Sequence, residues 1–310
     1  LSIFAFWNPP GNDIGRQWAK AQEMNKPLEL AIACIVDPAV QIAAATSITY
    51  GEDEMDFAGG LRGEGVDVVQ CETVDLAVPA TAEWVIEGRF LPERDIAIGP
   101  HSNPVGYYDD AQILPLIEVD CITHRKDPIW YATMEMEPPF DHNYMACMPL
   151  EGEVLSDLQT KIPEVQDVVV TPNLSYFVQL SVDGEQKPRA DFGKEVLQAV
   201  WGANGRWGPT AKLVVVVGPD VNPYDLSEIE WAIQTRVQPQ TDTIINEAGQ
   251  AFLMDPSAVK DPGHGIALVS EQVGIDATIK IPERFESYPK YSNAEPEDVI
   301  AIAEKLQGVL

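Results

Sequence analysis

Residues 78–108 read VPATAEWVIEGRFLPERDIAIGPHSNPVGYY and combine an apolar strand with a loop that is rich in glycine and proline. Trp84, Val85 and Ile86 end the strand, which we expect to break at Glu87-Gly88. The loop that follows contains Gly99, Pro100, Pro104 and Gly106. Glycine and proline at this density predict a backbone of fixed shape. An ordered loop loses little further freedom on binding, so we expect it to hold a ligand.

The composition is that of a globular protein with a strongly acidic surface. The chain has 310 residues, enough for about one or two domains. Its formal net charge of −29 comes from 49 acidic and 20 basic residues. Nucleic acid and anionic membranes would be repelled by this surface, so we exclude both as partners. No apolar run reaches the roughly 18 residues of a membrane-spanning helix, and we expect a cytoplasmic protein.

Neither the cysteines nor the first residues show the pattern of a zinc site, a disulfide framework or a signal peptide. The four cysteines stand far apart and never as a C-x-x-C pair: Cys34, Cys71, Cys121 and Cys147. This spacing favours neither a zinc site nor a disulfide framework, so we expect buried thiols. The chain begins with Leu1 and shows no basic segment followed by a cleavage site. We therefore expect that residues are missing in front of Leu1.

Ordered matches to a known family extend over most of the chain. They include residues 71–76 (CETVDL), 78–80 (VPA), 85–88 (VIEG), 99–100 (GP) and 106–108 (GYY). Further matches follow at residues 125–129 (RKDPI), 212–220, 231–236 (WAIQTR) and 274–278 (GIDAT). In these motifs the chain resembles the UbiD family of prenylated-FMN-dependent decarboxylases and carboxylases.

The resemblance implies an α+β fold with two main parts. A β-rich split-barrel flavin-binding domain would be followed by an α/β oligomerisation domain and a C-terminal helix. The break at Pro138-Pro139, and the alternation of helix and strand after it, favour a boundary near residue 140. We expect the rear part of the prenylated-FMN-binding domain at 1–140, the oligomerisation domain at 141–262, and a C-terminal extension with a terminal helix at 263–310.

Apolar periodicity predicts the main elements. Helices are expected at residues 14–24, 39–46, 152–162, 194–201 and 295–306. Strands are expected at residues 28–36, 66–70, 113–122, 128–134, 168–170, 176–182 and 213–217. Ser227 and Glu230 form a capping-box pattern, which predicts that a helix starts at Ser227.

The resemblance makes Glu54 a candidate metal ligand and cofactor contact. In the family this carboxylate coordinates a divalent metal, Mn or Mg, that bridges the cofactor phosphate, and K+ is a further candidate ion. Oxygen ligands suit such hard cations. The family's histidine ligand falls on Pro10, which cannot coordinate a metal. The metal site is therefore incomplete unless Asn8 or Asn12 takes that place.

Further cofactor contacts are implied at two places. Lys212 directly precedes the expected strand at 213–217, where the family places a lysine near the cofactor. Its ammonium offers three donors and a positive charge, although an ordinary strand-end lysine in water is the alternative. The backbone that lines the flavin in the family aligns with Ala44, Ala45, Thr46 and Ser47.

The loop departs from the family at its catalytic acids. UbiD decarboxylases typically read Glu-Gly-Pro-Phe-Gly-Glu where this chain has IGPHSN at residues 98–103. Ile98 and Asn103 replace the two carboxylates that shuttle the proton replacing CO₂. Asn103 can hydrogen-bond but carries no proton near neutral pH, whereas His101 titrates. His101 and Asn103 are the candidate catalytic residues, and a histidine that merely hydrogen-bonds its own turn is the alternative.

Two functions remain open. The first is a carboxy-lyase or carboxylase that acts reversibly on an aromatic or α,β-unsaturated acid with prenylated FMN. The second is a catalytically silent UbiD-like subunit of a hetero-oligomeric aromatic carboxylase, of the phenylphosphate-carboxylase type. The expected partners are a small aromatic acid and CO₂, together with further copies in a dimer or hexamer or a paralogous subunit.

Overall fold

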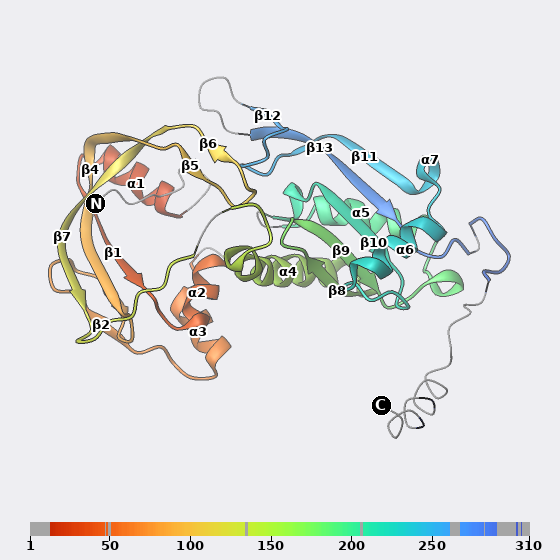
Figure 1. Cartoon of the computed structure of the whole chain (residues 1–310), viewed down its shortest axis with the longest axis horizontal. Helices are drawn as coiled ribbons and strands as arrows, with labels where there is room; N and C mark the ends of the chain where they lie inside the picture. The colour runs from red at the N-terminus through yellow and green to blue at the C-terminus, as the bar shows by residue number, and fades with distance from the viewer. Residues whose placement is uncertain are drawn as a thin grey trace.

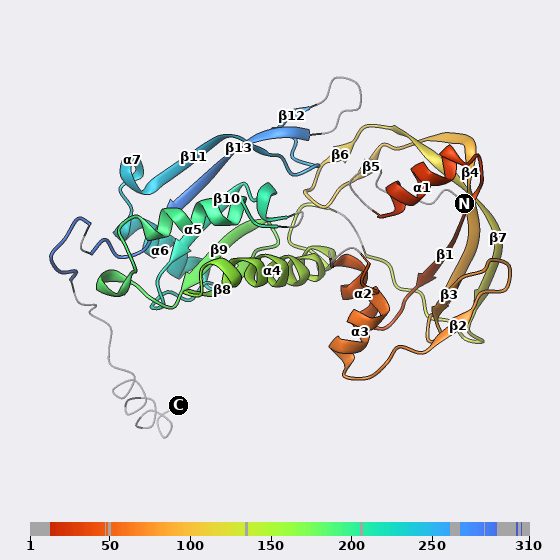
Figure 2. The same ribbon diagram turned by 180° about the vertical axis from the view of Figure 1, so that it is seen from behind.

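The computed structural model describes residues 13–46, 48, 51–133, 136–204, 207–260, 267–281, 283–289, 302 and 305. Figure 1 and Figure 2 show two lobes: the first lobe, residues 13–133, surrounds one sheet, and the second lobe, residues 136–281, surrounds a larger one. The long helix α4 (Asp141–Lys161) begins at the junction, where it contacts α2 (Pro38–Ala45) of the first lobe.

The frame of the first lobe is an antiparallel sheet in the order β1 (Leu28–Cys34), β4 (Trp84–Ile98) and β7 (Gln112–His124). The helix α1 (Asp13–Glu23) places Trp18 and Ala21 on one face, three residues apart, against Phe90 and Ile117 of the sheet. The ring centroids of Trp18 and Phe90 lie 5.4 Å apart. Burying each large side chain stabilises the lobe by roughly 1.5–3 kcal/mol.

The strand β4 does not end at Glu87-Gly88, so the predicted break is wrong. A register shift against β7 occurs there instead, and Gly88 lies so close to β7 that a Cβ would be 2.2 Å from the Glu118 carbonyl oxygen. The Glu87 side chain is buried and accepts hydrogen bonds from the Glu72 amide and from Thr73. Burial opposes its ionisation, but these hydrogen bonds outweigh burial and lower the pKa of Glu87.

The remaining elements of the first lobe are short. Asp37 and Asp53 cap α2 and α3 through side-chain bonds to backbone amides, as expected for an N-cap. Gly63, at φ 73°, ends α3 in the left-handed conformation. The elements are α3 (Glu54–Arg62), the antiparallel pair β2 (Val68–Gln70) and β3 (Ala77–Pro79), and the hairpin strands β5 (His101–Ser102) and β6 (Tyr108–Asp109).

The second lobe contains a six-stranded mixed sheet. Its order is β11 (Thr243–Gln250), β13 (Ala267–Asp276), β10 (Leu213–Val217), β9 (Ser175–Leu180) and β8 (Val165–Val170), and β12 (Val259–Lys260) pairs with β13. β9, β10 and β13 run parallel. The helices are α4, α5 (Phe192–Trp201), α6 (Leu226–Arg236), α7 (Pro239–Asp242) and the 3₁₀ turns η1 (Gly184–Gln186) and η2 (Gly208–Thr210).

Helices cover both faces of this sheet. Leu158 of α4 and Val196 of α5 pack on one face against Val178 and Val214, whereas Ile229 of α6 belongs to the core on the other face. A strand that is covered on both sides needs a continuous apolar run, and β10 is five such residues, LVVVV. The second lobe is therefore a three-layer α/β/α structure, and the whole chain mixes helix and sheet as predicted.

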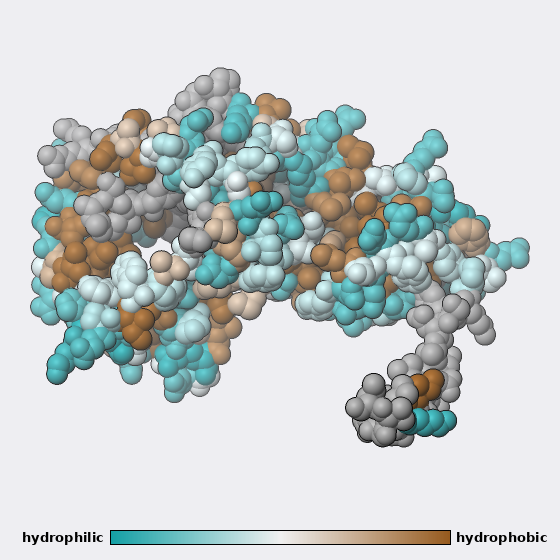
Figure 3. Space-filling view, viewed as in Figure 1, coloured by the Kyte–Doolittle hydropathy of each residue, from teal (hydrophilic) through white to brown (hydrophobic). Residues whose placement is uncertain are grey.

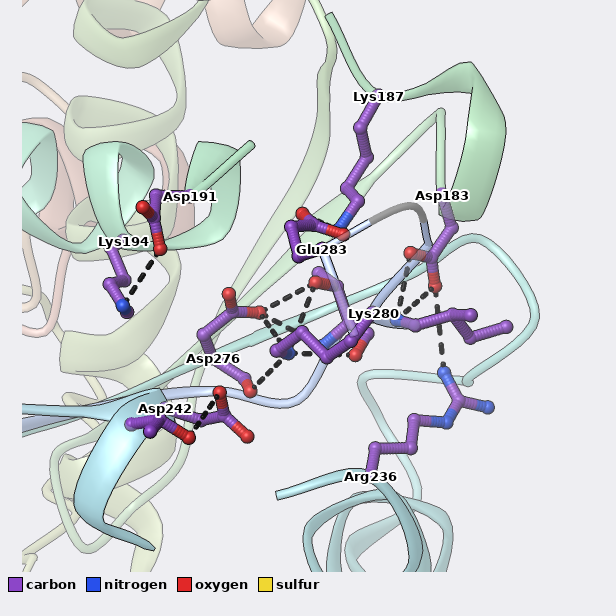
Figure 4. A network of polar contacts seen from close by, with 12 residues as sticks. Asp183, Lys187, Asp191, Lys194, Arg236, Asp242, Asp276, Lys280 and Glu283 are labelled. Atoms are coloured by element: carbon purple, nitrogen blue, oxygen red, sulfur yellow. Dashed lines mark hydrogen bonds and ion pairs between the residues drawn. The ribbon is translucent and has the colours of Figure 1, made fainter. Parts of the chain in front are cut away.

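An ion network follows the carboxyl ends of the parallel strands (Figure 4). Asp276 accepts hydrogen bonds from the amide and hydroxyl of Thr278 and lies 3.0 Å from the Lys280 ammonium. Asp183 accepts from the Ile279 amide and lies 3.6 Å from the Arg236 guanidinium. These groups are nearly all buried, so the network joins the end of β13 to α6 and to the segment after β9.

Most predicted elements are confirmed, with shifted ends, and three further expectations are wrong. Residues 128–133 form no strand, and α4 begins at Asp141 rather than at residue 152. The first turns of α4 expose Tyr144 and Met148 and include Pro149. This part of the helix therefore has no amphipathic pattern in the sequence. The N-cap of α6 is Asp225, which accepts from the Ser227 amide. The predicted helix at 295–306 lies outside the continuously described residues.

We propose that the boundary lies near residue 140 and that the second domain extends beyond residue 262. β1 and β10 lie in different sheets, which supports a division between them. β13, at residues 267–276, is hydrogen-bonded between β10 and β11. Its place inside the sheet argues against the expected start of a separate extension at residue 263.

The four thiols differ in burial, whereas all were expected to be buried. Cys147 is buried, and burial raises the pKa of its thiol to about 12, so it stays protonated near neutral pH. Cys34, Cys71 and Cys121 are only partly buried. Among the described residues no helix is long and apolar enough to cross a membrane.

Candidate functional site

The β5–β6 hairpin forms the shaped loop that the sequence predicted. The Gly99-Pro100 peptide is cis, and Gly99 and Gly106 have φ angles of 123° and 87°. A Cβ on Gly106 would lie 2.8 Å from the Cα of Glu137, so the tip of the hairpin approaches the backbone that leads into α4. Only glycine combines this conformation with this approach at low cost.

Asn103 organises the hairpin from inside. The residue is 1% exposed, and its Oδ1 accepts hydrogen bonds from the amides of Val105 and Tyr107. Its Nδ2 donates to Asp109 Oδ1 at 3.0 Å. Both ends of the amide are therefore engaged within the loop, which identifies Asn103 as a residue that folds the hairpin.

His101 faces the same carboxylate from the opposite strand. His101 and Asp109 are direct partners in the register of the hairpin, and Nε2 of His101 lies 3.8 Å from Asp109 Oδ2. Both side chains are about one-fifth exposed. Ile98, the other replacement in the loop, ends β4 half-buried and opposite Gln112. The histidine that the sequence singled out thus lies beside a carboxylate.

A large cavity lies between β1 and α2 of the first lobe and the start of α4, and we call it the α2–α4 cavity. Its volume is about 460 Å³, and Ala44 and Ala45 line it, as do Met145 and Ala146 from α4. The space-filling view shows the surface hollowed between the lobes (Figure 3). Two of the residues that were predicted to line a flavin therefore border a cavity of suitable size.

The lining of the α2–α4 cavity suits the ring system of a flavin better than its phosphate. Most lining side chains are aliphatic, and Gln41 and Tyr131, hydrogen-bonded to each other, add polar edges. Among the described lining residues, His142 alone can carry a positive charge. Thr46 follows α2 as its C-cap, and Ser47 lies outside the described residues.

Lys212 borders a different cavity, the aromatic cavity, of about 150 Å³. Tyr176, Trp207 and Phe252 line it, and Val105 of the hairpin closes one side. The Lys212 ammonium donates to Asp255 Oδ2 at 2.7 Å. Lys212 and the Ala44-Ala45 pair therefore lie at separate cavities.

Asp255 is a polar residue that the sequence analysis missed. Burial opposes ionisation of its carboxyl, but hydrogen bonds from Lys212, Ser257 and Ser270 outweigh burial and lower its pKa to about 2. The positive charge of Lys212 is thus balanced by a fixed carboxylate. No local signal in the sequence pairs these two residues, because they stand 43 positions apart with two strands and two helices between them.

Glu54 is exposed at the first residue of α3 and lines neither cavity. Within the described ranges no group of three or more His, Cys, Asp or Glu side chains is placed to hold a metal ion. Pro10, on which the expected histidine position falls, and the alternatives Asn8 and Asn12 lie outside those ranges. The described residues thus do not fit a metal site at Glu54.

Asn143 is a second residue that sequence reasoning missed. It lies in the first turn of α4, is 5% exposed, and donates from Nδ2 to the Pro104 carbonyl at 3.1 Å. This bond joins the tip of the hairpin to the start of the second lobe. An asparagine in the first turn of a helix whose start was not predicted carries no local signal of such a contact.

Comparison with known proteins assigns the family. A model described as the 3-octaprenyl-4-hydroxybenzoate carboxy-lyase Rift-related domain matches residues 2–138. A model described as the C-terminal domain of the same carboxy-lyase matches residues 143–277. The fold and both matches therefore agree on one family. The chain belongs to the UbiD family.

Solved structures with this fold include UbiD-class enzymes. HmfF from Pelotomaculum thermopropionicum, in complex with FMN, superposes with a TM-score of 0.83 at 30% identity, covering 98% of this chain and 64% of that one. Vanillic acid decarboxylase from Sedimentibacter hydroxybenzoicus, in its open form, gives a TM-score of 0.79 at 28% identity and covers 96% and 62%. An evolved dimeric HmfF is in complex with prenylated FMN.

Similar curated proteins are longer than this chain. An uncharacterised protein of Archaeoglobus fulgidus is 35% identical over 260 residues, which are 84% of this chain and 52% of that protein. An uncharacterised protein of Synechocystis is 35% identical over 269 residues, or 86% and 52%. The chain thus spans about half the length of the curated relatives that it matches.

Proposed function

We propose that this chain forms part of a prenylated-FMN-dependent carboxy-lyase or carboxylase acting on an aromatic or α,β-unsaturated carboxylic acid. The observation that carries the proposal is the α2–α4 cavity, whose size and apolar lining fit a flavin ring at Ala44 and Ala45. When bound, the prenylated flavin would supply the electron sink for losing or adding CO₂. No role for a metal is included, because the described residues do not fit one.

In this function the α2–α4 cavity binds the flavin ring and excludes water from it. The hairpin next to the junction supplies the proton that replaces CO₂, through His101. Asn103 keeps the hairpin in shape, since both ends of its amide are engaged there. In this function the substrate is an aromatic acid, together with CO₂. The protein partners are additional copies of the chain or a paralogous subunit.

The test is to produce the protein in a cell that also makes a flavin prenyltransferase and to measure the cofactor that it binds. We expect the purified protein to carry about one prenylated flavin per chain by absorption and mass spectrometry, and to release or exchange the carboxylate of an aromatic acid. Ala45→Phe fills the cavity and should lower the bound flavin at least about tenfold, whereas Gln198→Phe on the exposed side of α5 should not. Equal loading of both variants would contradict the proposed cavity.

The silent-subunit alternative is favoured by one observation. Asn103 stands where family decarboxylases have a glutamate, and it is buried and fully used in folding the hairpin. A subunit of this kind would load little or no flavin alone and would gain activity with a paralogous chain. Colourless protein that restores carboxylation to such a partner would support this alternative over an independent enzyme.

A further inference from the structure

The aromatic cavity has the size and the lining of a site for one small ring. Its volume is about 150 Å³, and a cavity of about this volume with an apolar lining can hold a benzene molecule. Trp207 and Phe252 line it with their ring centroids 6.1 Å apart, and the buried Tyr176 adds a third ring. A ligand ring in this cavity would contact aromatic side chains, which bind another ring in stacked or edge-to-face geometry.

Two hydroxyl groups in the lining leave acceptors for a ligand. Tyr176 and Thr210 both donate to the Trp207 carbonyl, at 3.4 and 2.9 Å. A hydroxyl oxygen that donates its hydrogen still has lone pairs with which to accept. Burial raises the pKa of Tyr176, so its hydroxyl stays protonated. A ligand that carries its own O–H group can therefore donate to one of these oxygens.

The charges of the cavity disfavour an ionised ligand. In the described part of the chain, two of the three donors of the Lys212 ammonium are engaged, by Asp255 Oδ2 at 2.7 Å and by Ser257 Oγ at 2.6 Å. The third donor can serve a ligand oxygen. Lys212 and Asp255 are the charged residues of the described lining, and their charges cancel. A ligand carboxylate would lose water here without gaining an unbalanced positive charge, whereas a neutral hydroxyl loses less on burial.

We propose that the aromatic cavity is a binding site for a neutral phenol, a single aromatic ring that carries a hydroxyl group. The site is separate from the α2–α4 cavity, so the inference goes beyond the proposed function and requires no flavin. The ring lies among the three aromatic side chains, and its hydroxyl lies toward Lys212. Val105 of the β5–β6 hairpin closes one side of the cavity. A bound phenol therefore contacts both lobes at once.

The first measurement is a titration of the full chain with phenol, followed by fluorine NMR after labelling with 5-fluorotryptophan. The chain has seven tryptophans, and Trp207→Phe identifies the signal of Trp207. We expect this signal to shift with a dissociation constant of about 1 mM or lower. Benzoate, which is ionised at pH 7, should bind at least about tenfold more weakly. A Trp207 signal that phenol does not shift, or equal affinity for phenol and benzoate, overturns the proposal.

Three variants locate the bound phenol. Val105→Phe places a larger side chain in the aromatic cavity and should weaken phenol binding at least about tenfold. The matched control is Val68→Phe, the same change at an exposed valine of β2, which should leave the affinity unchanged. Ala45→Phe fills the α2–α4 cavity and should also leave the shift of the Trp207 signal unchanged. Parent affinity in Val105→Phe, or loss of the shift in Ala45→Phe, would place the phenol elsewhere and overturn the proposal.

Asp255→Asn tests the role of charge. The change removes the carboxylate that balances Lys212, so the preference for phenol over benzoate should fall at least about tenfold. Asp56→Asn, at an exposed residue of α3, should leave the preference unchanged. The same preference in Asp255→Asn as in the parent would overturn the assignment of a neutral ligand. The parent chain and Val105→Phe decide the existence of the site even where Asp255→Asn does not fold.

Discussion

Asn103 illustrates how a single replacement changes what a loop can do. Its amide accepts from Val105 and Tyr107 and donates to Asp109, so it closes the turn and orients a carboxylate. A glutamate in this buried position would place a second negative charge beside Asp109 and would remove the donor. Restoring the family's acid at this one position would therefore cost stability.

Asp183 provides a prediction on pH. Burial raises the pKa of its carboxyl to about 6, although the amides of Gly184 and Ile279 and the charge of Arg236 favour ionisation. The unfolded carboxyl titrates near pH 4, so between about pH 4 and 6 the folded chain holds a proton that the unfolded chain releases. This stabilisation is complete below about pH 4 and is lost as the pH rises through 6.

We expect the free energy of unfolding of the parent, relative to Asp183→Asn, to fall by about 3 kcal/mol from pH 4 to pH 7. Urea denaturation at unit steps of pH measures this difference. Asp255→Asn is the counter-check: the pKa of Asp255 is lowered to about 2, so its stabilisation is present above about pH 4 and is lost toward pH 2. Parallel curves for the parent and Asp183→Asn would contradict the prediction.

At the scale of elements, α5 depends on a glycine where it meets the end of β13. A Cβ added to Gly193 would lie 2.4 Å from the carboxyl carbon of Asp276, which is 2% exposed. Asp276 also holds the Thr278 hydroxyl and the Lys280 ammonium, so it cannot move aside without breaking those contacts. The helix thus rests on the ion network of Figure 4 through a position without a side chain.

We expect Gly193→Ala to lower the free energy of unfolding by about 3 kcal/mol, the upper range for an overpacked site. The matched control is Gly152→Ala in α4, where the residue is exposed and no atom lies within 4 Å of the new methyl group. That change should raise the free energy of unfolding by up to about 1 kcal/mol, because alanine favours the helix. Chemical denaturation measures the free energy of unfolding of both variants. Equal changes in the two variants would contradict the prediction.

On the scale of the whole molecule, the lobes meet through the hairpin and the start of α4. Asn143 donates to the Pro104 carbonyl, and Gly106 packs on the backbone at Glu137. Val105 of the same hairpin lines the aromatic cavity of the second lobe. The loop that carries His101 is therefore held by both lobes, and a change at their junction should reach it.

Asn143→Ala tests this connection by hydrogen exchange. Loss of one buried hydrogen bond costs about 1 kcal/mol, so amides in the peptide 99–110 should exchange roughly five- to tenfold faster. Asn204→Ala removes an exposed bond to Asp157 and should leave that peptide unchanged. Unchanged exchange of the hairpin in Asn143→Ala would show that the lobes do not hold it.

The sequence by itself determined the family, the mixed α/β fold, and the strands and helices with strong local patterns. β10 was predicted because LVVVV is apolar throughout, and α1 because Trp18 and Ala21 recur on one face. The sequence also singled out the turn at Gly99-Pro100, since proline fixes φ and glycine permits a positive φ that other residues avoid. Each of these signals lies within one element.

Only the tertiary structure decided which side chains meet. β13 places the buried polar residues Ser270 and Gln272 in the middle of a sheet, so its sequence gave no apolar strand signal. Asp255 pairs with Lys212, and Asn143 with Pro104, across separations of 43 and 39 residues. Such contacts depend on the packing of separate elements, and local propensity contains no information about them.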